Sequence, residues 1–312
     1  MITYVKGNLF ESPAKVLVNT VNTVGVMGKG IAKDFKTIYP EMFREYQKLC
    51  ETKKMEIGNL WLYKTSNKWI LNFPTKTTWR LSSKIEYIKC GLEKFIKEYA
   101  ERGITSIAFP TLGCGNGELD WEKQVRPLME KYLKNLPIDV FVYLHTTTPL
   151  VPEHRDIKAI AEWLRSEPEN LGFAEVWHDL IQLIGSGLSL QTLTNKQSFQ
   201  AKVVTAAETG IVFNIDNEEH FIPEETLMEL WNLIRNYGFG IGRYMPSGLE
   251  SLADYLVALF SRLPYCRPIE VSTDYAVLNN IGLQFIAKSQ KADIQQKLPF
   301  ELKREEHAKT GC

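Results

Sequence analysis

The sequence predicts an α/β fold over residues 1–150 and a second, mixed α+β and helix-rich domain over residues 151–312. In the first half, short apolar strand patterns alternate with amphipathic helix patterns, which is typical of an α/β layer fold. In the second half, helix patterns surround one hairpin pattern. The two halves also differ in charge. The first carries 22 Lys and Arg against 15 Asp and Glu, and the second carries 15 against 22.

Each element of the first half has a local signature. Apolar runs predict strands at residues 2–8, 15–21, 60–64, 69–73, 104–110 and 138–145. Helical periodicity predicts helices at residues 30–39, 40–51, 84–103 and 120–136. Pro40 separates the first two helices, because proline is tolerated at a helix start and not further inside. Gly103 is a C-terminal stop, and Asp120 is the expected N-cap of the last helix.

The second half gives coarser signals. Amphipathic patterns predict helices at residues 157–167, 173–184, 224–238 and 248–263, and a hairpin at 199–215. Residues 146–156 contain two prolines and are expected to form a linker between the domains. From Ser289 onward the chain is polar and charged, so we expect it to fray or to dock on a partner.

Composition excludes several classes of protein. No run of about 18 apolar residues occurs, so we expect no membrane-spanning segment. The first ten residues lack a charged region followed by an apolar core, so we expect no signal peptide. The cysteines are scattered without a CxxC pair, which argues against a disulfide framework or a zinc site. We therefore expect a cytoplasmic protein without metal or cofactor.

Two glycine-rich loops predict a phosphate-binding site. The stretch "VNTVNTVGVMGKGIA" (Val18 to Ala32) places a strand, a glycine loop and a helix in that order. Such a junction presents backbone N–H groups to an anion. It fits neither the Walker A spacing nor GxGxxG. A second loop, "FPTLGCGNGELDW" (Phe109 to Trp121), also follows a strand and precedes a helix. Two loops at the carboxyl ends of strands could clamp a diphosphate.

Four segments together resemble the macrodomain family. They are "KGNLFES", "VLVNTVNTVGVMGKGIAKDF", "LNFPTKTTWR" and "FPTLGCGNGELDW", in this order and spacing. Within that family, residues 1–145 are similar to the DNA ADP-ribosyl glycohydrolase branch, the DarG-type antitoxins of DarT–DarG toxin–antitoxin systems. Residues 151–312 match such antitoxins only in position and approximate size. The resemblance implies a three-layer α/β/α sandwich with a mixed sheet that binds ADP-ribose.

The resemblance also implies which residues contact ADP-ribose. Asn8 and Leu9 would lie near the adenine, and Asn22 would meet the distal ribose. Asn19 belongs to the same asparagine pair, and the alternative role of either asparagine is to brace the loop. The two glycine loops would hold the phosphates through Gly28, Lys29, Gly30, Ile31, Ala32, Thr111, Gly113, Cys114, Gly115, Asn116 and Gly117. Cys114 has no histidine in its motif and is interpreted as a small loop residue.

Lys76 is the candidate catalytic residue. In this macrodomain branch the lysine of the "FPTKTTWR" motif is catalytic, and it could attack the anomeric carbon of the distal ribose or form a Schiff base. Either route needs a neutral amine and so a lowered pKa, with Lys29 and Arg80 as candidate cationic neighbours. The alternative is a lysine that only pairs with anions.

The acid partner of Lys76 is left open by the sequence. Related protein-directed hydrolases have an aspartate where this chain has Gly117, and the nearest carboxylates are Glu118 and Asp120. Asp120 is favoured as a helix cap. A water molecule or the substrate phosphate is the remaining candidate.

Three residues after Lys76 are candidates for contact with DNA. Thr78, Trp79 and Arg80 follow the lysine closely, and an exposed Trp79 could stack on a base. Core packing of Trp79 is the alternative.

The expected function is therefore that of an antitoxin. It would hydrolyse the bond between ADP-ribose and a DNA base, thymidine in single-stranded DNA. Its second domain would bind the cognate DarT-type ADP-ribosyltransferase toxin. There, acids and aromatics mixed over residues 169–180, 216–230 and 248–254 could imitate nucleic acid, or the acids could be ordinary helix faces and caps. The alternatives are a protein-directed mono-ADP-ribosyl hydrolase and a non-catalytic ADP-ribose reader.

Overall fold

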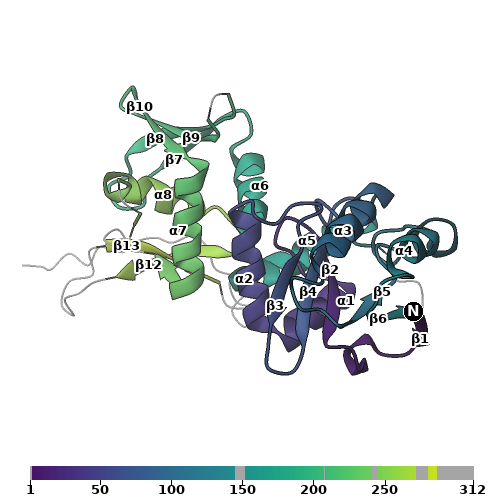
Figure 1. The fold of residues 1–312 in the computed structure, drawn as a ribbon. Coiled ribbons are helices and arrows are strands. Elements are labelled where there is room, and N and C mark those ends of the chain that lie inside the picture. The colour runs from purple at the N-terminus through teal and green to yellow at the C-terminus, as the bar shows by residue number, and fades with distance from the viewer. Residues whose placement is uncertain are drawn as a thin grey trace, which may run out of the picture. The chain divides into compact units, whose positions relative to one another are not determined.

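The structure is a computed structural model that describes residues 2–144, 152–206, 208–240, 245–246, 248–271 and 280–286. The chain divides into two compact units (Figure 1). The first comprises Met1–Arg165 and Asn170–Gln182, and the second comprises Ser166–Glu169 and Leu183–Cys312. The first unit therefore extends beyond the expected boundary at residue 150.

The first unit is built around one six-stranded sheet. Its strands are β1 (Ile2–Lys6), β2 (Val16–Val21), β3 (Trp61–Lys64), β4 (Trp69–Pro74), β5 (Ser106–Pro110) and β6 (Asp139–Leu144). Its helices are α1 (Gly30–Ile38), α2 (Pro40–Glu51), α3 (Ile85–Glu98), α4 (Arg126–Leu133), α5 (Ile157–Ser166) and α6 (Phe173–Ile184). The strand order is β1-β6-β5-β2-β4-β3, and only β3 pairs antiparallel with its neighbour. The predicted mixed sheet is confirmed.

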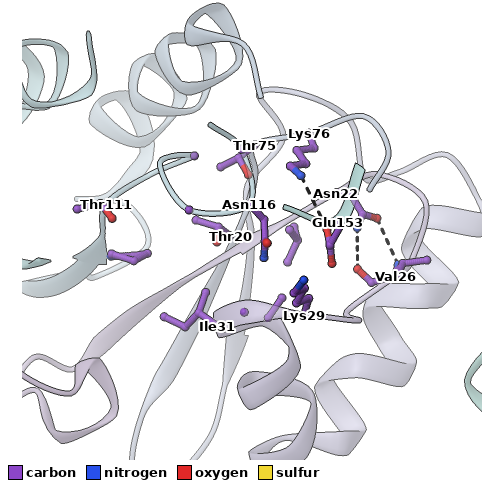
Figure 2. Close-up of a pocket in the computed structure, with 17 residues that line it drawn as sticks. Thr20, Asn22, Val26, Lys29, Ile31, Thr75, Lys76, Thr111, Asn116 and Glu153 are labelled. Carbon is purple, nitrogen blue, oxygen red and sulfur yellow. Dashed lines mark hydrogen bonds and ion pairs between the residues drawn. The ribbon is translucent and has the colours of Figure 1, made fainter. Parts of the chain in front are cut away.

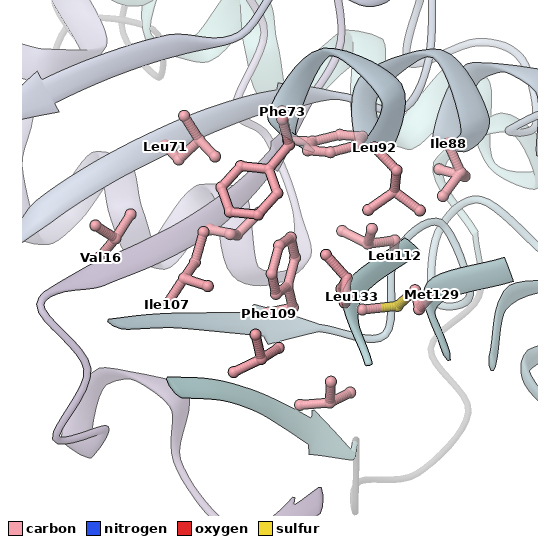
Figure 3. Close-up of a cluster of buried hydrophobic side chains, with 14 of the residues drawn as sticks. Val16, Leu71, Phe73, Ile88, Leu92, Ile107, Phe109, Leu112, Met129 and Leu133 are labelled. Atoms are coloured by element: carbon pink, nitrogen blue, oxygen red, sulfur yellow. The ribbon is translucent and has the colours of Figure 1, made fainter. Parts of the chain in front are cut away.

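Helices cover both faces of this sheet. Along β2, Val16 and Val18 join a buried cluster with side chains of α3 and α4, which Figure 3 shows. The intervening Leu17 joins a second cluster with side chains of α1 and α2. Because successive strand residues point to opposite faces, the apolar strand runs bury both faces at once. The three-layer α/β/α sandwich that the resemblance implied is confirmed.

Local signals located some element ends of the first unit, although α3 ends at Glu98 and not at the expected Gly103. Pro40 begins α2, as predicted. The side chain of Asp120 accepts a hydrogen bond from the Lys123 backbone N–H at 2.8 Å, which confirms it as an N-cap. The helix that it caps differs from the prediction in one respect. Its first turn, Trp121–Val125, is π-helical before α4 begins at Arg126.

The second unit contains more strands than the sequence indicated. A four-stranded antiparallel sheet has the order β10-β9-β8-β7, with β7 (Leu188–Gln191), β8 (Ser198–Val204), β9 (Gly210–Ile215) and β10 (Glu218–Pro223). A second sheet has the order β11-β13-β12, with β11 (Phe239–Gly240), β12 (Cys266–Val271) and β13 (Asn280–Phe285). The helices are α7 (Glu224–Tyr237) and α8 (Ala253–Phe260). The predicted hairpin is β8–β9.

The expectations about membrane spans, the linker and the polar C-terminal stretch can be compared with the structure only over the described residues. Across the described ranges, no helix combines the length and apolarity needed to cross a membrane. The polar stretch from Ser289 onward and the first part of the expected linker, residues 146–151, lie outside the described residues.

Candidate functional site

A pocket opens at the carboxyl ends of three neighbouring parallel strands of the first unit, β2, β4 and β5. Both glycine loops and the segment after β4 contribute to it (Figure 2). It is lined by Thr20, Val21, Asn22, Val26, Lys29, Gly30, Ile31, Ala32, Thr75, Lys76, Pro110, Thr111, Gly113, Gly115, Asn116, Gly117 and Glu153. The pocket lies where open α/β sheets bind their ligands.

The first glycine loop ends at the N-terminus of α1. Gly30 is the first residue of this helix, and no side chain caps its N-terminus. Gly30 has a φ of 58°, and a Cβ there would lie 2.7 Å from Nδ2 of Asn116 in the second loop. The positive φ favours glycine here, and any larger side chain would have to displace the Asn116 side chain. The helix N-terminus beside them favours an anionic ligand.

Asn22 holds the first loop in shape. Its Oδ1 accepts hydrogen bonds from the backbone N–H of Val24 at 3.1 Å and from the hydroxyl of Tyr46 at 3.1 Å. Its Nδ2 donates to the Val26 carbonyl at 2.7 Å. The side chain lines the pocket, but its amide is already engaged within the protein. Asn22 thus performs the loop-bracing role that was weighed for both asparagines, and Asn19 contacts the same loop through a hydrogen bond of 3.8 Å from its Nδ2 to Sδ of Met27.

Two glycines of the second loop, Gly113 and Gly117, have no space for a larger side chain. A Cβ on Gly117 would lie 2.2 Å from Oγ of Ser83 and 2.3 Å from the Gly113 carbonyl oxygen. Gly113 itself has a φ of 68°. Oδ1 of Asn116 is buried and has no hydrogen-bond partner among the described residues. This loop therefore offers a close backbone approach and one unsatisfied acceptor at the pocket.

Lys76 lies just after β4 and is only 6% exposed. Its Nζ has no hydrogen-bond partner within the described ranges, and it lies 3.8 Å from Oε2 of Glu153. Burial lowers the pKa of the ammonium group, while the carboxylates of Glu153 and Glu118 act in the opposite direction. A lysine in this environment needs less free energy to become a neutral amine.

Glu153 is a pocket residue that sequence reasoning missed. It stands in the expected linker, in a short 3-10 turn (Glu153–Arg155), and it is also 6% exposed. Burial raises the pKa of its carboxyl to about 7, against the opposing effect of Lys76 and Lys29. No local motif marks this residue. The only signal available was its position shortly after the last strand of the sheet.

The turn that carries Glu153 is fixed to the second glycine loop. Nε2 of His154 lies 2.6 Å from Oε2 of Glu118, and Arg155 forms an ion pair with the same carboxylate. The hydrogen bond to His154 is the main reason why the pKa of Glu118 is lowered. Glu118 thus serves as the anchor of the Glu153 turn.

Comparison with known proteins identifies the family to which this fold belongs. The model of the Macro domain family matches residues 18–128. Over 143 residues the chain is 31% identical to the ADP-ribose glycohydrolase OARD1 of Bos taurus, and the match covers 46% of this chain and 90% of that protein. The chain belongs to the macrodomain family.

Other macrodomain proteins are more similar in sequence. Over 147 residues the chain is 46% identical to the DNA ADP-ribosyl glycohydrolase of Mycobacterium tuberculosis, covering 46% of this chain and 42% of that protein. The solved macrodomain of Thermus aquaticus DarG is 42% identical, with a TM-score of 0.44, covering 46% of this chain and 97% of that one. The match thus spans less than half of the mycobacterial relative.

The expected contact of Trp79 with a DNA base is wrong for this structure. Trp79 is fully buried in the macrodomain unit, so it has no exposed face for stacking. Its Nε1 donates to Oε1 of Glu175 at 2.9 Å. Arg80 is also held by Glu175, through two hydrogen bonds of 2.6 Å. Thr78 is half-buried, and its Oγ1 accepts from the Arg80 backbone N–H at 3.4 Å.

Five of the residues expected to bind ADP-ribose do not line the macrodomain pocket. Asn8 caps a short 3-10 turn, and Leu9 is part of the buried core. Asn19 donates to Oδ1 of Asn72 within the sheet, and it is fully buried. Gly28 lies against the ring of Trp163, and Cys114 turns its thiol to the Leu112 carbonyl.

Burial also raises the pKa of the Cys114 thiol to about 12, which agrees with its interpretation as a loop residue. The remaining expected residues, from both glycine loops and Lys76, come together in one pocket. The macrodomain site is thus largely where the sequence placed it, with Glu153 added from outside the recognised motifs.

Proposed function

We propose that this chain is an antitoxin that removes ADP-ribose from a DNA base, with Lys76 as the catalytic residue. One observation carries the proposal. A buried lysine and two glycine loops line the same pocket at the carboxyl ends of β2, β4 and β5. The loops suit a diphosphate, and the lysine suits a reaction at an electrophilic carbon beside it.

The charges in the pocket support ADP-ribose as the ligand. The N-terminus of α1 and the ammonium groups of Lys29 and Lys76 favour an anion. The unsatisfied Oδ1 of Asn116 can accept a hydrogen bond from a sugar hydroxyl. We expect the diphosphate to bridge the loops, with the distal ribose toward Lys76.

The proposed reaction begins with a neutral Lys76 amine. Burial disfavours its charged form, so a larger fraction is available as a nucleophile near neutral pH. The amine attacks the anomeric carbon of the distal ribose, and the base leaves. Water then releases ADP-ribose from the enzyme. Hydrolysis through a Schiff base after ring opening uses the same amine.

Relatives favour DNA as the substrate. The chain is 46% identical to a protein named DNA ADP-ribosyl glycohydrolase, against 31% for the ADP-ribose glycohydrolase OARD1. A fusion of a DNA ADP-ribosyl transferase with a DNA ADP-ribosyl glycohydrolase is 38% identical over 162 residues. We propose thymidine in single-stranded DNA as the modified base, the cognate DarT-type toxin as the partner of the second unit, and the cytoplasm as the site of action.

A side-by-side comparison of substrates tests the proposed function. The full chain is incubated with an ADP-ribosylated single-stranded oligonucleotide and, separately, with a protein ADP-ribosylated on carboxylates. Faster release of ADP-ribose from the oligonucleotide is expected. Release from the protein alone would establish the protein-directed hydrolase instead. Calorimetric binding of ADP-ribose without release from either substrate would establish a non-catalytic reader.

A further inference from the structure

We propose that Glu153 is the acid–base partner of Lys76 in the proposed reaction. This inference rests on the proposed function and supplies the group that the second glycine loop does not provide. Glu153 reaches the pocket from the turn after the macrodomain sheet, and its Oε2 lies 3.8 Å from Nζ of Lys76 (Figure 2). Both side chains are almost fully buried.

The second glycine loop and the residues just after it do not supply a suitable acid. Position 117, where related protein-directed hydrolases have an aspartate, is a glycine in this chain. Gly117 cannot be replaced by an aspartate without displacing Ser83 or the Gly113 backbone, because even a Cβ would lie within 2.3 Å of them. Asp120 is engaged as the cap of the following helix. Glu118 pairs with His154 and Arg155 and influences Lys76 only through its charge.

The charged groups around Glu153 suit a group that gains and loses a proton. Lys76 and Lys29 favour its carboxylate, whereas burial favours its neutral form, and the balance places its pKa at about 7. The neighbouring His154 and Arg155 are directed to Glu118. A general acid or base works best when its pKa lies near the working pH.

The proposed step is balanced in protons and electrons. The Lys76 ammonium gives one proton to the Glu153 carboxylate, which leaves an amine and a carboxylic acid. The amine lone pair forms the bond to the anomeric carbon, and the bond from that carbon to the base breaks with its electrons on the base. The proton of Glu153 then goes to the departing base, which leaves Glu153 as a carboxylate. Water next forms a bond to the anomeric carbon as the bond from that carbon to Lys76 breaks with its electrons on the amine. Glu153 takes a proton from this water and returns it to Lys76, which restores the ammonium and the carboxylate.

The substitution Glu153→Gln tests this role, because the amide keeps the size of the side chain and cannot carry the proton. The matched control is Glu162→Gln, an exposed glutamate on α5. We expect E153Q to lower the rate of release from the modified oligonucleotide by about 10²–10⁴-fold, with ADP-ribose binding retained. E162Q should react like the wild type.

The pH dependence gives a second, independent readout on the wild-type chain. Protonation of Glu153 removes the proton acceptor, so kcat should fall as pH decreases through about 7. The residual kcat of E153Q should not show this decrease toward low pH, which is the acidic limb of the pH profile. A wild-type kcat that shows no such limb between about pH 5 and 9 would overturn the assignment, whether or not the variant folds.

The direction in which E153Q changes the reaction rate distinguishes a Glu153 that transfers a proton from one that only fills the pocket or keeps Lys76 protonated. Removing the carboxylate lowers the pKa of Lys76 further, because Glu153 now raises it. If Glu153 only plugged the pocket or kept Lys76 protonated, E153Q would therefore be as active as the wild type or faster, and the proposal would be overturned. Failure of the proposed function gives a different result, because the wild type itself would then not release ADP-ribose from DNA.

Discussion

Lys76 and Glu153 face each other in a pocket where burial favours the neutral form of both side chains. It lowers the pKa of the lysine and raises that of the glutamate to about 7, so the two pKa values are brought closer together. Such convergent shifts are found at catalytic sites more often than in structural ion pairs. This is the residue-scale reason why the pocket suits chemistry and not only binding.

Gly117 gives a residue-scale prediction about the second loop. Adding a Cβ in Gly117→Ala would create contacts of 2.2–2.3 Å, so we expect a destabilisation of about 1–3 kcal/mol. Gly115 has no neighbour within 4 Å of the same position, and Gly115→Ala should leave the unfolding temperature of the first unit unchanged or slightly raised. Differential scanning calorimetry of the full chain measures both. Equal unfolding temperatures for the two variants would show that the loop adjusts freely.

Most of the pocket was predictable at the residue scale because its members are close together in two motifs. Glycine loops are recognised by their composition, and Lys76 was identified through the resemblance of its "FPTKTTWR" motif to the macrodomain family. Glu153 and Glu175 could not be found in this way. Each acts on a partner far away in the sequence, as Glu175 does on Trp79 across 96 positions, and no local pattern encodes that contact.

At the scale of elements, α6 completes the macrodomain unit. Its Glu175 accepts hydrogen bonds from both Trp79 and Arg80, and Arg165 of α5 lies 3.6 Å away. This carboxylate is 1% exposed and is surrounded by donors. The segment that follows Lys76 is therefore fixed by a helix that the sequence had assigned to the second domain.

This arrangement predicts a local effect of Glu175→Gln. Breaking a buried ion pair from one side costs about 3–5 kcal/mol, because the other charge is left unpaired. We expect faster amide hydrogen exchange over residues 173–182 and around Trp79. The exposed Glu162→Gln change on α5 serves as the control. Hydrogen exchange is the suitable measurement, since it reports local opening even in a chain of two units. Unchanged exchange in E175Q would contradict the bracing role.

Helices and strands of the first unit were predictable because apolar periodicity decides them. The second unit was harder. Its short strands, such as β7 and β11, carry too few residues for a clear alternation, and β11 pairs with β13, which is distant in sequence. The hairpin β8–β9 was found because both strands are long and adjacent.

At the scale of the whole molecule, the charge difference between the halves suggests how the chain meets its proposed partner. The turn between β9 and β10 presents Asp216, Glu218 and Glu219, all exposed. Toxin binding through such a surface should weaken as salt rises, because counterions screen exposed charges. We expect the triple change D216N, E218Q and E219Q to weaken toxin binding to the full chain and to flatten its salt dependence. Binding of the wild type that is insensitive to salt would exclude imitation of nucleic acid.

The measurement that tests the central claim most directly is single-turnover release of ADP-ribose from a modified oligonucleotide by Lys76→Ala. The matched control is Lys97→Ala, an exposed lysine on α3. Calorimetry with free ADP-ribose is carried out on the same preparations. We expect K76A to bind ADP-ribose and to release none from DNA, while K97A releases it at the wild-type rate. Full activity of K76A on the oligonucleotide would contradict the account.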